Sequence, residues 1–167
     1  MGYVHDTAMS KFIPPTAFHY VTGTYTLAAG AVAGTIALHV SGNNTHIVTI
    51  PIMLESNSVA QKGAYLKSIE IDYEILTAEP TSMTWTLNKV TRGADLAVAV
   101  VAAVTKTNTL TAANGKAVDQ HRETITLTTP AWIDNDEYYL LELSCPGGAG
   151  GNTIDFLGAV ANFTLRI

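Results

Sequence analysis

Apolar and polar residues alternate along residues 65–76, which is the longest regular pattern in the chain. Successive side chains of a β-strand point to opposite faces of its sheet, so this alternation predicts a long strand with one buried and one wetted face. One row holds Tyr65, Lys67, Ile69, Ile71, Tyr73 and Ile75, and the other holds Leu66, Ser68, Glu70, Asp72, Glu74 and Leu76. The same period recurs up to the end of the sequence, which favours an all-β protein.

Segments with a strand pattern follow one another along the chain, separated by Gly- and Asn-rich turns. Eight or nine such strands predict a single antiparallel β-sandwich of the jelly-roll type over residues 16–167. The segments are Ala17–Leu27, Val32–Val40, His46–Met53, Ala64–Thr77, Ser82–Val90, Ala97–Val104, Glu123–Thr129, Glu137–Cys145 and Ile154–Ile167.

Residues 94–104 are the one ambiguous segment, because their alanines would suit a helix. Their valines and the lack of a helix cap favour a strand, followed by a long loop over residues 105–119.

Alternation also assigns the inner rows of the predicted strands. In the last strand Leu157, Ala159, Ala161, Phe163, Leu165 and Ile167 share one face. The residues predicted to form the buried core are Ile69, Ile71, Tyr73, Trp85, Leu87, Ile125, Leu127, Leu141, Leu143, Phe163 and Leu165.

Residues 1–15 show no period and are predicted to be an extended N-terminal arm without an element of its own. Pro14 and Pro15 hold its end extended. Its apolar side chains suit a docked segment better than a solvated tail, so we expect the arm to contact a neighbouring subunit; a disordered tail is the alternative. The predicted contact residues are Tyr3, Val4, Met9, Phe12 and Ile13.

Composition narrows the functional classes. Charged residues make up 14% of the chain, against about 25% in an average soluble domain, which favours burial of part of the surface in an oligomer,. The net charge of −5 and the scattered Lys and Arg residues argue against a nucleic-acid partner,. No apolar run is long enough to span a bilayer, and the first 15 residues lack the apolar core of a signal peptide.

The sequence offers no convincing catalytic or metal site. Residues 132–137 are acidic but do not have EF-hand spacing, so a solvated turn is favoured over a calcium site,. The five histidines form no pair at metal-ligand spacing,. No Gly-x-Ser-x-Gly motif is present, and Cys145 lies in the apolar row of its strand as a small buried hydrophobe,. We therefore expect no enzyme activity, no metal and no cofactor.

A carbohydrate-binding sandwich is the alternative from a different functional class. Such modules typically present a row of aromatic side chains on one face. Tyr20 and Tyr25 are separated by an odd number of positions, and a regular strand would place them on opposite faces,. On the sequence alone the lectin-like interpretation is the weaker one, and a hydrolase ranks third.

Several segments together resemble small jelly-roll virion structural proteins of bacterial viruses, many known only from environmental sequences. The resemblance covers Phe12–Ile167 and implies a coat or decoration protein with no catalytic residues. It also implies a virion location after assembly in the host cytoplasm. We thus expect a homo-oligomer, a trimer or larger, with other virion proteins as further partners and no nucleic acid or membrane. The segments that carry the resemblance are Ile50–Ile52, Lys62–Ile69, Thr129–Tyr139, Gly158–Ala159 and Phe163–Leu165.

Overall fold

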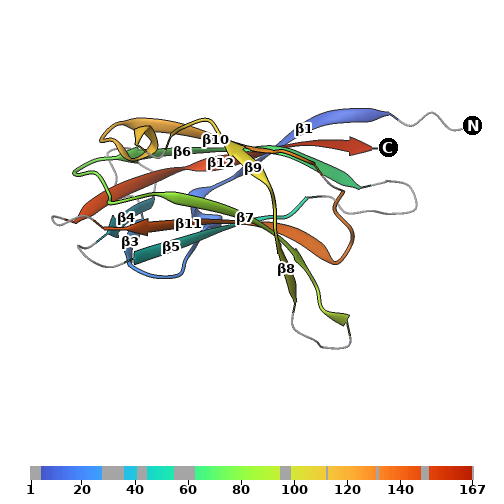
Figure 1. Cartoon of the computed structure of the whole chain (residues 1–167), viewed down its shortest axis with the longest axis horizontal. Helices are drawn as coiled ribbons and strands as arrows, with labels where there is room; N and C mark the ends of the chain where they lie inside the picture. The colour runs from blue at the N-terminus through green and yellow to red at the C-terminus, as the bar shows by residue number, and fades with distance from the viewer. Residues whose placement is uncertain are drawn as a thin grey trace, which may run out of the picture.

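The computed structural model describes residues 5–27, 36–40, 45–54, 63–94, 99–111, 113–130, 132–147 and 151–166. Their strands form two antiparallel sheets that pack face to face as a β-sandwich (Figure 1). The strands are β1 (Asp6–Ile13), β2 (His19–Tyr20), β3 (Thr24–Leu27), β4 (Ile36–Val40), β5 (Thr45–Ile52), β6 (Ala64–Ile75), β7 (Thr84–Thr91), β8 (Val100–Ala103), β9 (Lys106–Asn108), β10 (Gln120–Leu127), β11 (Glu137–Pro146) and β12 (Asn152–Arg166), with short 3-10 turns η1 (Pro15–Ala17) and η3 (Asn114–Lys116).

The strand order is that of a jelly roll. One sheet, called sheet A here, has the order β3-β4-β12-β6-β10-β9, with β1 also paired to β12; sheet B has the order β2-β5-β11-β7-β8. Eight main strands make up the sandwich, with β4-β12-β6-β10 of sheet A facing β5-β11-β7-β8 of sheet B. Along the chain, each main strand is followed by one in the other sheet, except that β8 follows β7 in sheet B. This double-sheet arrangement confirms the predicted all-β jelly-roll sandwich.

Three differences from the predicted strands concern short elements. The loop expected over residues 105–119 contains β9 and η3, and the predicted strand Ala17–Leu27 is divided into β2 and β3. Residues 6–13 form the additional strand β1. In the ambiguous segment Val100–Ala103 is a strand, as predicted, whereas residues 95–98 lie outside the described part.

The core lies between the two sheets. All eleven residues predicted to be buried are buried; nine belong to this core, and Phe163 and Leu165 form a smaller cluster with Ala64. Inward rows of β6, β10 and β12 pack against those of β5, β7 and β11. Cys145 is fully buried among them, and burial raises the pKa of its thiol to about 12. None of the helical turns in the described residues has the length and apolar character needed to cross a membrane.

A β-bulge corrects the predicted rows of β6. Asn162 pairs with Ser68 and Phe163 pairs with Leu66, so Lys67 between the two pairs has no partner on β12. Because of this extra residue, side chains of β6 before Ser68 point to the opposite face of the sheet from the one that simple alternation predicts. Leu66 therefore lies in the core, while Lys67 is exposed and Tyr65 faces outward, contrary to the simple alternation.

A second bulge corrects the predicted row of β12. Phe156 pairs with Tyr73 and Gly158 with Asp72, which leaves Leu157 unpaired. Leu157 is 37% exposed instead of sharing the buried face with the alanines that follow it.

A tight turn at Gly23 corrects the expectation for Tyr20 and Tyr25. Gly23 has a φ of 109°, and a Cβ there would lie 1.7 Å from Nδ1 of His46, so only glycine fits this turn,. The chain reverses between β2 and β3, and the rings of Tyr20 and Tyr25 stack with 4.7 Å between their centroids. The two tyrosines thus lie together, not on opposite faces.

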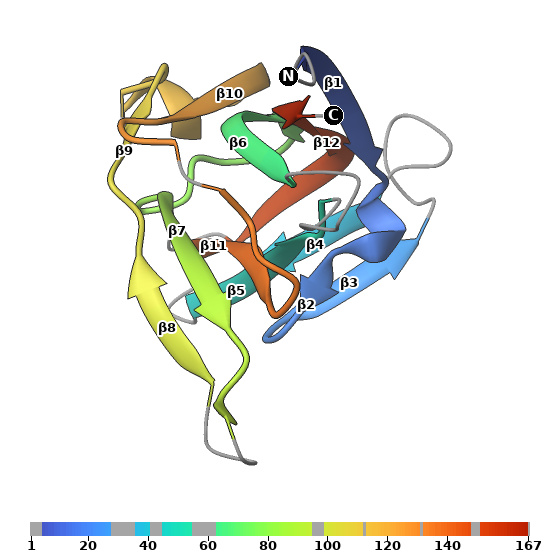
Figure 2. The ribbon, with the colours of Figure 1, turned by 90° about the vertical axis from the view of Figure 1, so that its right-hand side faces the viewer.

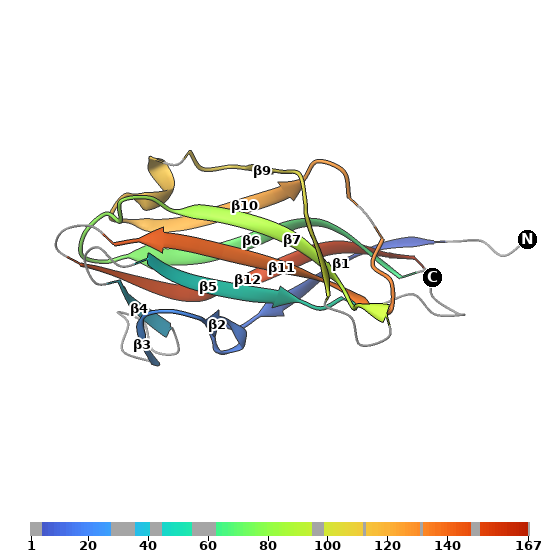
Figure 3. The same cartoon turned by 60° about the horizontal axis from the view of Figure 1, so that its bottom comes forward.

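Strand β1 corrects the expectation that residues 1–15 form no element of their own. It pairs with residues 159–166 of β12, on the edge that β4 occupies along residues 152–156. β1 and the C-terminal end of β12 lie side by side at one end of the sandwich (Figures 1 and 3). Contact of this segment with a neighbouring subunit stays a prediction.

Candidate functional site

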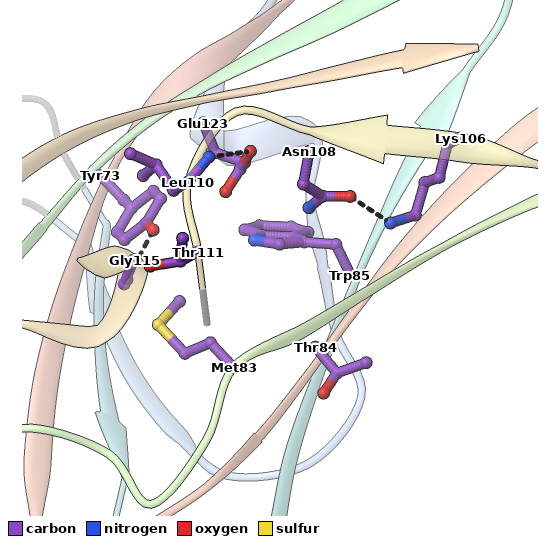
Figure 4. A pocket seen from close by; sticks show the side chains of 10 residues that line it. All are labelled: Tyr73, Met83, Thr84, Trp85, Lys106, Asn108, Leu110, Thr111, Gly115 and Glu123. Carbon is purple, nitrogen blue, oxygen red and sulfur yellow. Dashed lines mark hydrogen bonds between the residues drawn. The ribbon is translucent and has the colours of Figure 1, made fainter. Parts of the chain in front are cut away.

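A cavity of about 290 Å³ opens at one edge of the sandwich, between β7 and the segment that runs from β9 to η3 (Figure 4). Its walls come from both sheets and from this segment. The lining residues are Tyr73, Met83, Thr84, Trp85, Lys106, Asn108, Leu110, Thr111, Gly115 and Glu123. We call it the Trp85 cavity.

The loop over the cavity is fixed by two side chains from the inner face of sheet A. β9 pairs with the end of β10, and the chain then leaves the sheet. The hydroxyl of Tyr73 donates a 2.7 Å hydrogen bond to the carbonyl oxygen of Gly115 in η3. Glu123 binds the other end of the loop, at residues 109 and 110. The cavity wall is therefore held in place by the core.

Glu123 is the unusual residue of the site, because it is only 2% exposed. Its Oε1 atom accepts hydrogen bonds from the Thr109 amide (3.0 Å), the Thr109 hydroxyl (3.3 Å) and the Leu110 amide (3.3 Å). All three bonds go to Oε1, and none of them uses the Oε2 atom. A buried carboxylate is costly unless its oxygens are bonded, so this oxygen is available to a donor that enters the cavity.

Aromatic and thioether groups form the apolar part of the wall. Trp85 lies on the inner row of β7, with 6.2 Å between its ring centroid and that of Tyr73. Met83 precedes it on the same row and is also buried. Figure 4 shows the indole ring and the Glu123 carboxylate lining the same cavity.

Two polar side chains of β9 form the rim. The Lys106 ammonium donates a 2.6 Å hydrogen bond to Oδ1 of Asn108. Burial lowers the pKa of Lys106, and the charge of Glu123 opposes that shift. The cavity thus combines a carboxylate, an ammonium and an amide with an apolar wall, a set that recognises hydroxyl-bearing ligands by both donors and acceptors.

The residues predicted for subunit contact lie elsewhere. Tyr3 and Val4 are outside the described residues. Met9 and Phe12, on β1, are 42% and 61% exposed, whereas Ile13 is 6% exposed and belongs to this chain's own core. Two of the five therefore present apolar surface to the outside of the molecule.

In the acidic segment at residues 132–137, the turn into β11 is exposed at residues 134–136, as predicted, whereas Ile133 is fully buried. Glu137 is bound within the chain: its Oε2 lies 2.6 Å from the Lys89 ammonium and accepts a 3.0 Å hydrogen bond from the Asp134 amide. Among the described residues no three His, Cys, Asp or Glu side chains are grouped to hold a metal ion.

The Trp85 cavity was not predicted from the sequence, although one signal for it was present. Glu123 has the same parity as Ile125 and Leu127, so the alternation already placed a carboxylate in a buried row,. The contribution of the β9–η3 segment carried no sequence signal, because its position depends on contacts with Tyr73 and Glu123.

Comparison with known proteins gives only distant similarities. No family model matches the chain, and no curated protein matches it. Among solved structures, a family two carbohydrate esterase from Cellvibrio japonicus has a TM-score of 0.43 at 6% identity, over 98% of this chain and 36% of that chain. The chain therefore spans about a third of that esterase.

Two further solved structures are carbohydrate-binding proteins by their descriptions. TmCBM61, solved in complex with β-1,4-galactotriose, has a TM-score of 0.42 at 7% identity, over 92% of this chain and 86% of that chain. A structure of carbohydrate-binding modules from the β-sandwich superfamily has a TM-score of 0.44 at 14% identity, over 95% and 56%. At these scores the similarities assign neither an activity nor a ligand to this chain.

Proposed function

We propose that this jelly-roll domain is a carbohydrate-binding module without catalytic activity, and that the Trp85 cavity is its saccharide site. The observation that carries the proposal is Glu123. Its buried carboxylate has one oxygen fully used by the loop's hydrogen bonds and a second that none of them uses, in a cavity that also contains an indole ring.

The chemistry of the cavity matches that of a sugar ring. A pyranose has hydroxyl groups that both donate and accept, and C–H faces that pack on aromatic rings. Glu123 would accept hydrogen bonds from hydroxyls, Lys106 and Asn108 would donate them, and Trp85 would contact the apolar face. A volume of about 290 Å³ suits one or two sugar residues, not a long chain,.

Calorimetric titration with a panel of neutral hexoses and their disaccharides tests the proposal. Glu123→Gln keeps the shape and the Oε1 acceptor but removes the charge, and we expect it to weaken binding about tenfold. Glu142→Gln, a half-buried position on β11 outside the cavity, is the matched control. Absence of binding at millimolar sugar, or equal effects of the two variants, would overturn the proposal.

A second candidate function, a self-assembling coat or decoration component of a virion, is favoured by the exposed edge strands. All four residues of β8 are exposed, including Val100 at 63% and Val101 at 60%. β1 presents Met9 and Phe12, and the two strands lie on opposite sides of the sandwich (Figure 2). Unprotected apolar edges favour strand pairing between copies, which supports a homo-oligomer.

Light scattering at micromolar concentration tests this second candidate. We expect a trimer or larger assembly, and a smaller mass after deletion of residues 2–13. A monomer at all concentrations, or an assembly unchanged in mass and melting temperature by the deletion, would contradict it. This result is independent of the sugar titration, because neither edge lines the Trp85 cavity.

A further inference from the structure

A second cavity, of about 440 Å³, lies on the outer face of sheet A beside the C-terminal end of β12. This end of the sandwich is opposite the one that carries η3 (Figures 1 and 3). β1, β6, β12 and the segment before β11 all contribute side chains to it. We call it the Trp132 cavity.

The bulge in β6 creates this cavity. It turns Tyr65 and Lys67 outward, and Tyr65 then pairs with Thr164 on one side and forms a bridge to Trp132 on the other. Ala8 pairs with Thr164 from β1. The short side chains of Ala8 and Thr164 therefore lie between longer side chains, and this difference in length produces the hollow.

Positive charge predominates around the hollow. Arg166 donates hydrogen bonds of 2.7 and 3.0 Å from Nε and Nη2 to the two carboxylate oxygens of Asp6, and its guanidinium lies 4.7 Å from the centroid of the Trp132 ring. The Nη1 group of Arg166 and the ammonium of Lys67 have no hydrogen-bond partner among the described residues. Two cations and one carboxylate leave a net positive charge in the cavity.

Thr164 adds an unused polar group at the same place. It lines the cavity but is only 6% exposed, and its hydroxyl has no hydrogen-bond partner among the described residues. A buried hydroxyl without a partner destabilises the protein, and an acceptor that reaches the cavity floor would remove that cost.

We propose that the Trp132 cavity binds a ligand that carries a carboxylate on a six-membered ring, with hexuronic acids as the saccharide example. Lys67 and Nη1 of Arg166 hold the carboxylate, the hydroxyl of Thr164 donates a hydrogen bond to it, and Tyr65 with Trp132 forms the wall against the ring. Arg166 is held for this role on both sides, by Asp6 and by the indole. The inference goes beyond the neutral-sugar site, since it uses another cavity and a charged group.

Amide NMR titration of the full chain with D-glucuronate, D-glucose and methyl sulfate tests the inference. We expect glucuronate alone to shift the resonances of Tyr65, Lys67 and Thr164. Lys67→Gln should weaken glucuronate binding about fivefold, the scale of one exposed charge interaction, and added salt should weaken it further. Thr164→Val, which keeps the side-chain shape, should also weaken it.

Lys116→Gln, in η3 at the other end of the sandwich, is the charge-matched control and should change nothing. Four outcomes would overturn the inference. The first two are no shift of these resonances at millimolar glucuronate, and shifts with glucose that equal those with glucuronate. The other two are methyl sulfate binding as strong as that of glucuronate, and an unchanged affinity of Lys67→Gln for glucuronate. Glu123→Gln should leave glucuronate binding intact, so failure at the Trp85 cavity is distinguishable from failure here.

Discussion

Arg166 binds Asp6 through two hydrogen bonds across 160 positions of sequence, and so joins the first described strand to the last. The pair closes the β1–β12 ladder at its outer end, whereas Ile13 closes the other end in the core. Between these ends the strand is exposed. Its attachment therefore depends on backbone pairing, on this ion pair, and on hydrogen bonds from Ser10 to Oδ1 of Asn162 (2.8 Å) and from Lys11 to the carbonyl oxygen of Met53 (2.7 Å).

The Asp6–Arg166 pair makes the attachment of β1 dependent on pH. The hydrogen bonds from Arg166 lower the pKa of Asp6. A carboxyl group with a lowered folded-state pKa stabilises the fold above its unfolded pKa of about 3.9, and this contribution is lost as the pH falls through the folded value. We expect amide exchange in β1 to accelerate below about pH 4 relative to the intrinsic rate. Asp6→Asn removes the charge, so amide exchange in β1 should already be fast at neutral pH. Asp136→Asn, in an exposed turn, is the control and should leave exchange in β1 unchanged.

The hydroxyl of Tyr73 is expected to stabilise the wall of the Trp85 cavity. Tyr73→Phe leaves the Gly115 carbonyl without its 2.7 Å hydrogen bond, at a cost of about 1–3 kcal/mol in the free energy of unfolding,. Urea unfolding measures this cost. Tyr138→Phe, at a half-buried position on β11, should have less effect, and an equal loss in both variants would mean that the bond to Gly115 is unimportant.

Truncation in the intersheet core should be far more costly than truncation at the surface. Leu141 is fully buried on β11, and Leu141→Ala should lower the free energy of unfolding by about 2–5 kcal/mol,. Val118 is 50% exposed, and Val118→Ala should change it by less than about 0.5 kcal/mol,. Similar melting temperatures for the two variants would contradict the assignment of the core.

Gly158 is expected to tolerate no side chain. Its φ is 141°, and a Cβ there would lie 2.6 Å from Cε2 of Phe12 and 3.2 Å from the carbonyl oxygen of Ile13. Gly158→Ala should therefore lower the free energy of unfolding by more than about 1 kcal/mol. Phe12→Ala in the same chain should recover part of this loss, because it removes the ring but not the backbone strain. A strictly additive double variant would show that the ring is not the obstacle.

The sequence was sufficient for the long central strands and the core because alternation is a local property, whereas the short strands β1 and β9 were not predicted. The inner rows of β7 and β10 can be counted directly, as at Trp85 and Ile125, and both are buried. The errors occur where a partner strand decides the outcome. Whether Lys67 pairs depends on β12, about a hundred positions away, and no count along β6 alone reveals the bulge,.

The candidate sites were less predictable for the same reason. The alternation could have revealed that Glu123 is a buried carboxylate. It could not have revealed that Thr109 and Leu110 would bind that carboxylate. At the other cavity Asp6, Tyr65 and Arg166 come from three distant segments. These residues come together because of the way the strands are paired, and a single sequence does not show which distant strands pair.

The central position of β12 in sheet A has a consequence for synthesis. β12 lies between β6 on one side and β4 and β1 on the other, yet it follows every other described strand in the sequence. Until residues 152–166 emerge, the edges of β4 and β6 have no partner there, and β1 has nothing to pair with. Sheet A therefore closes only after all the other described strands have been synthesised, and slow refolding with a high contact order is expected in vitro.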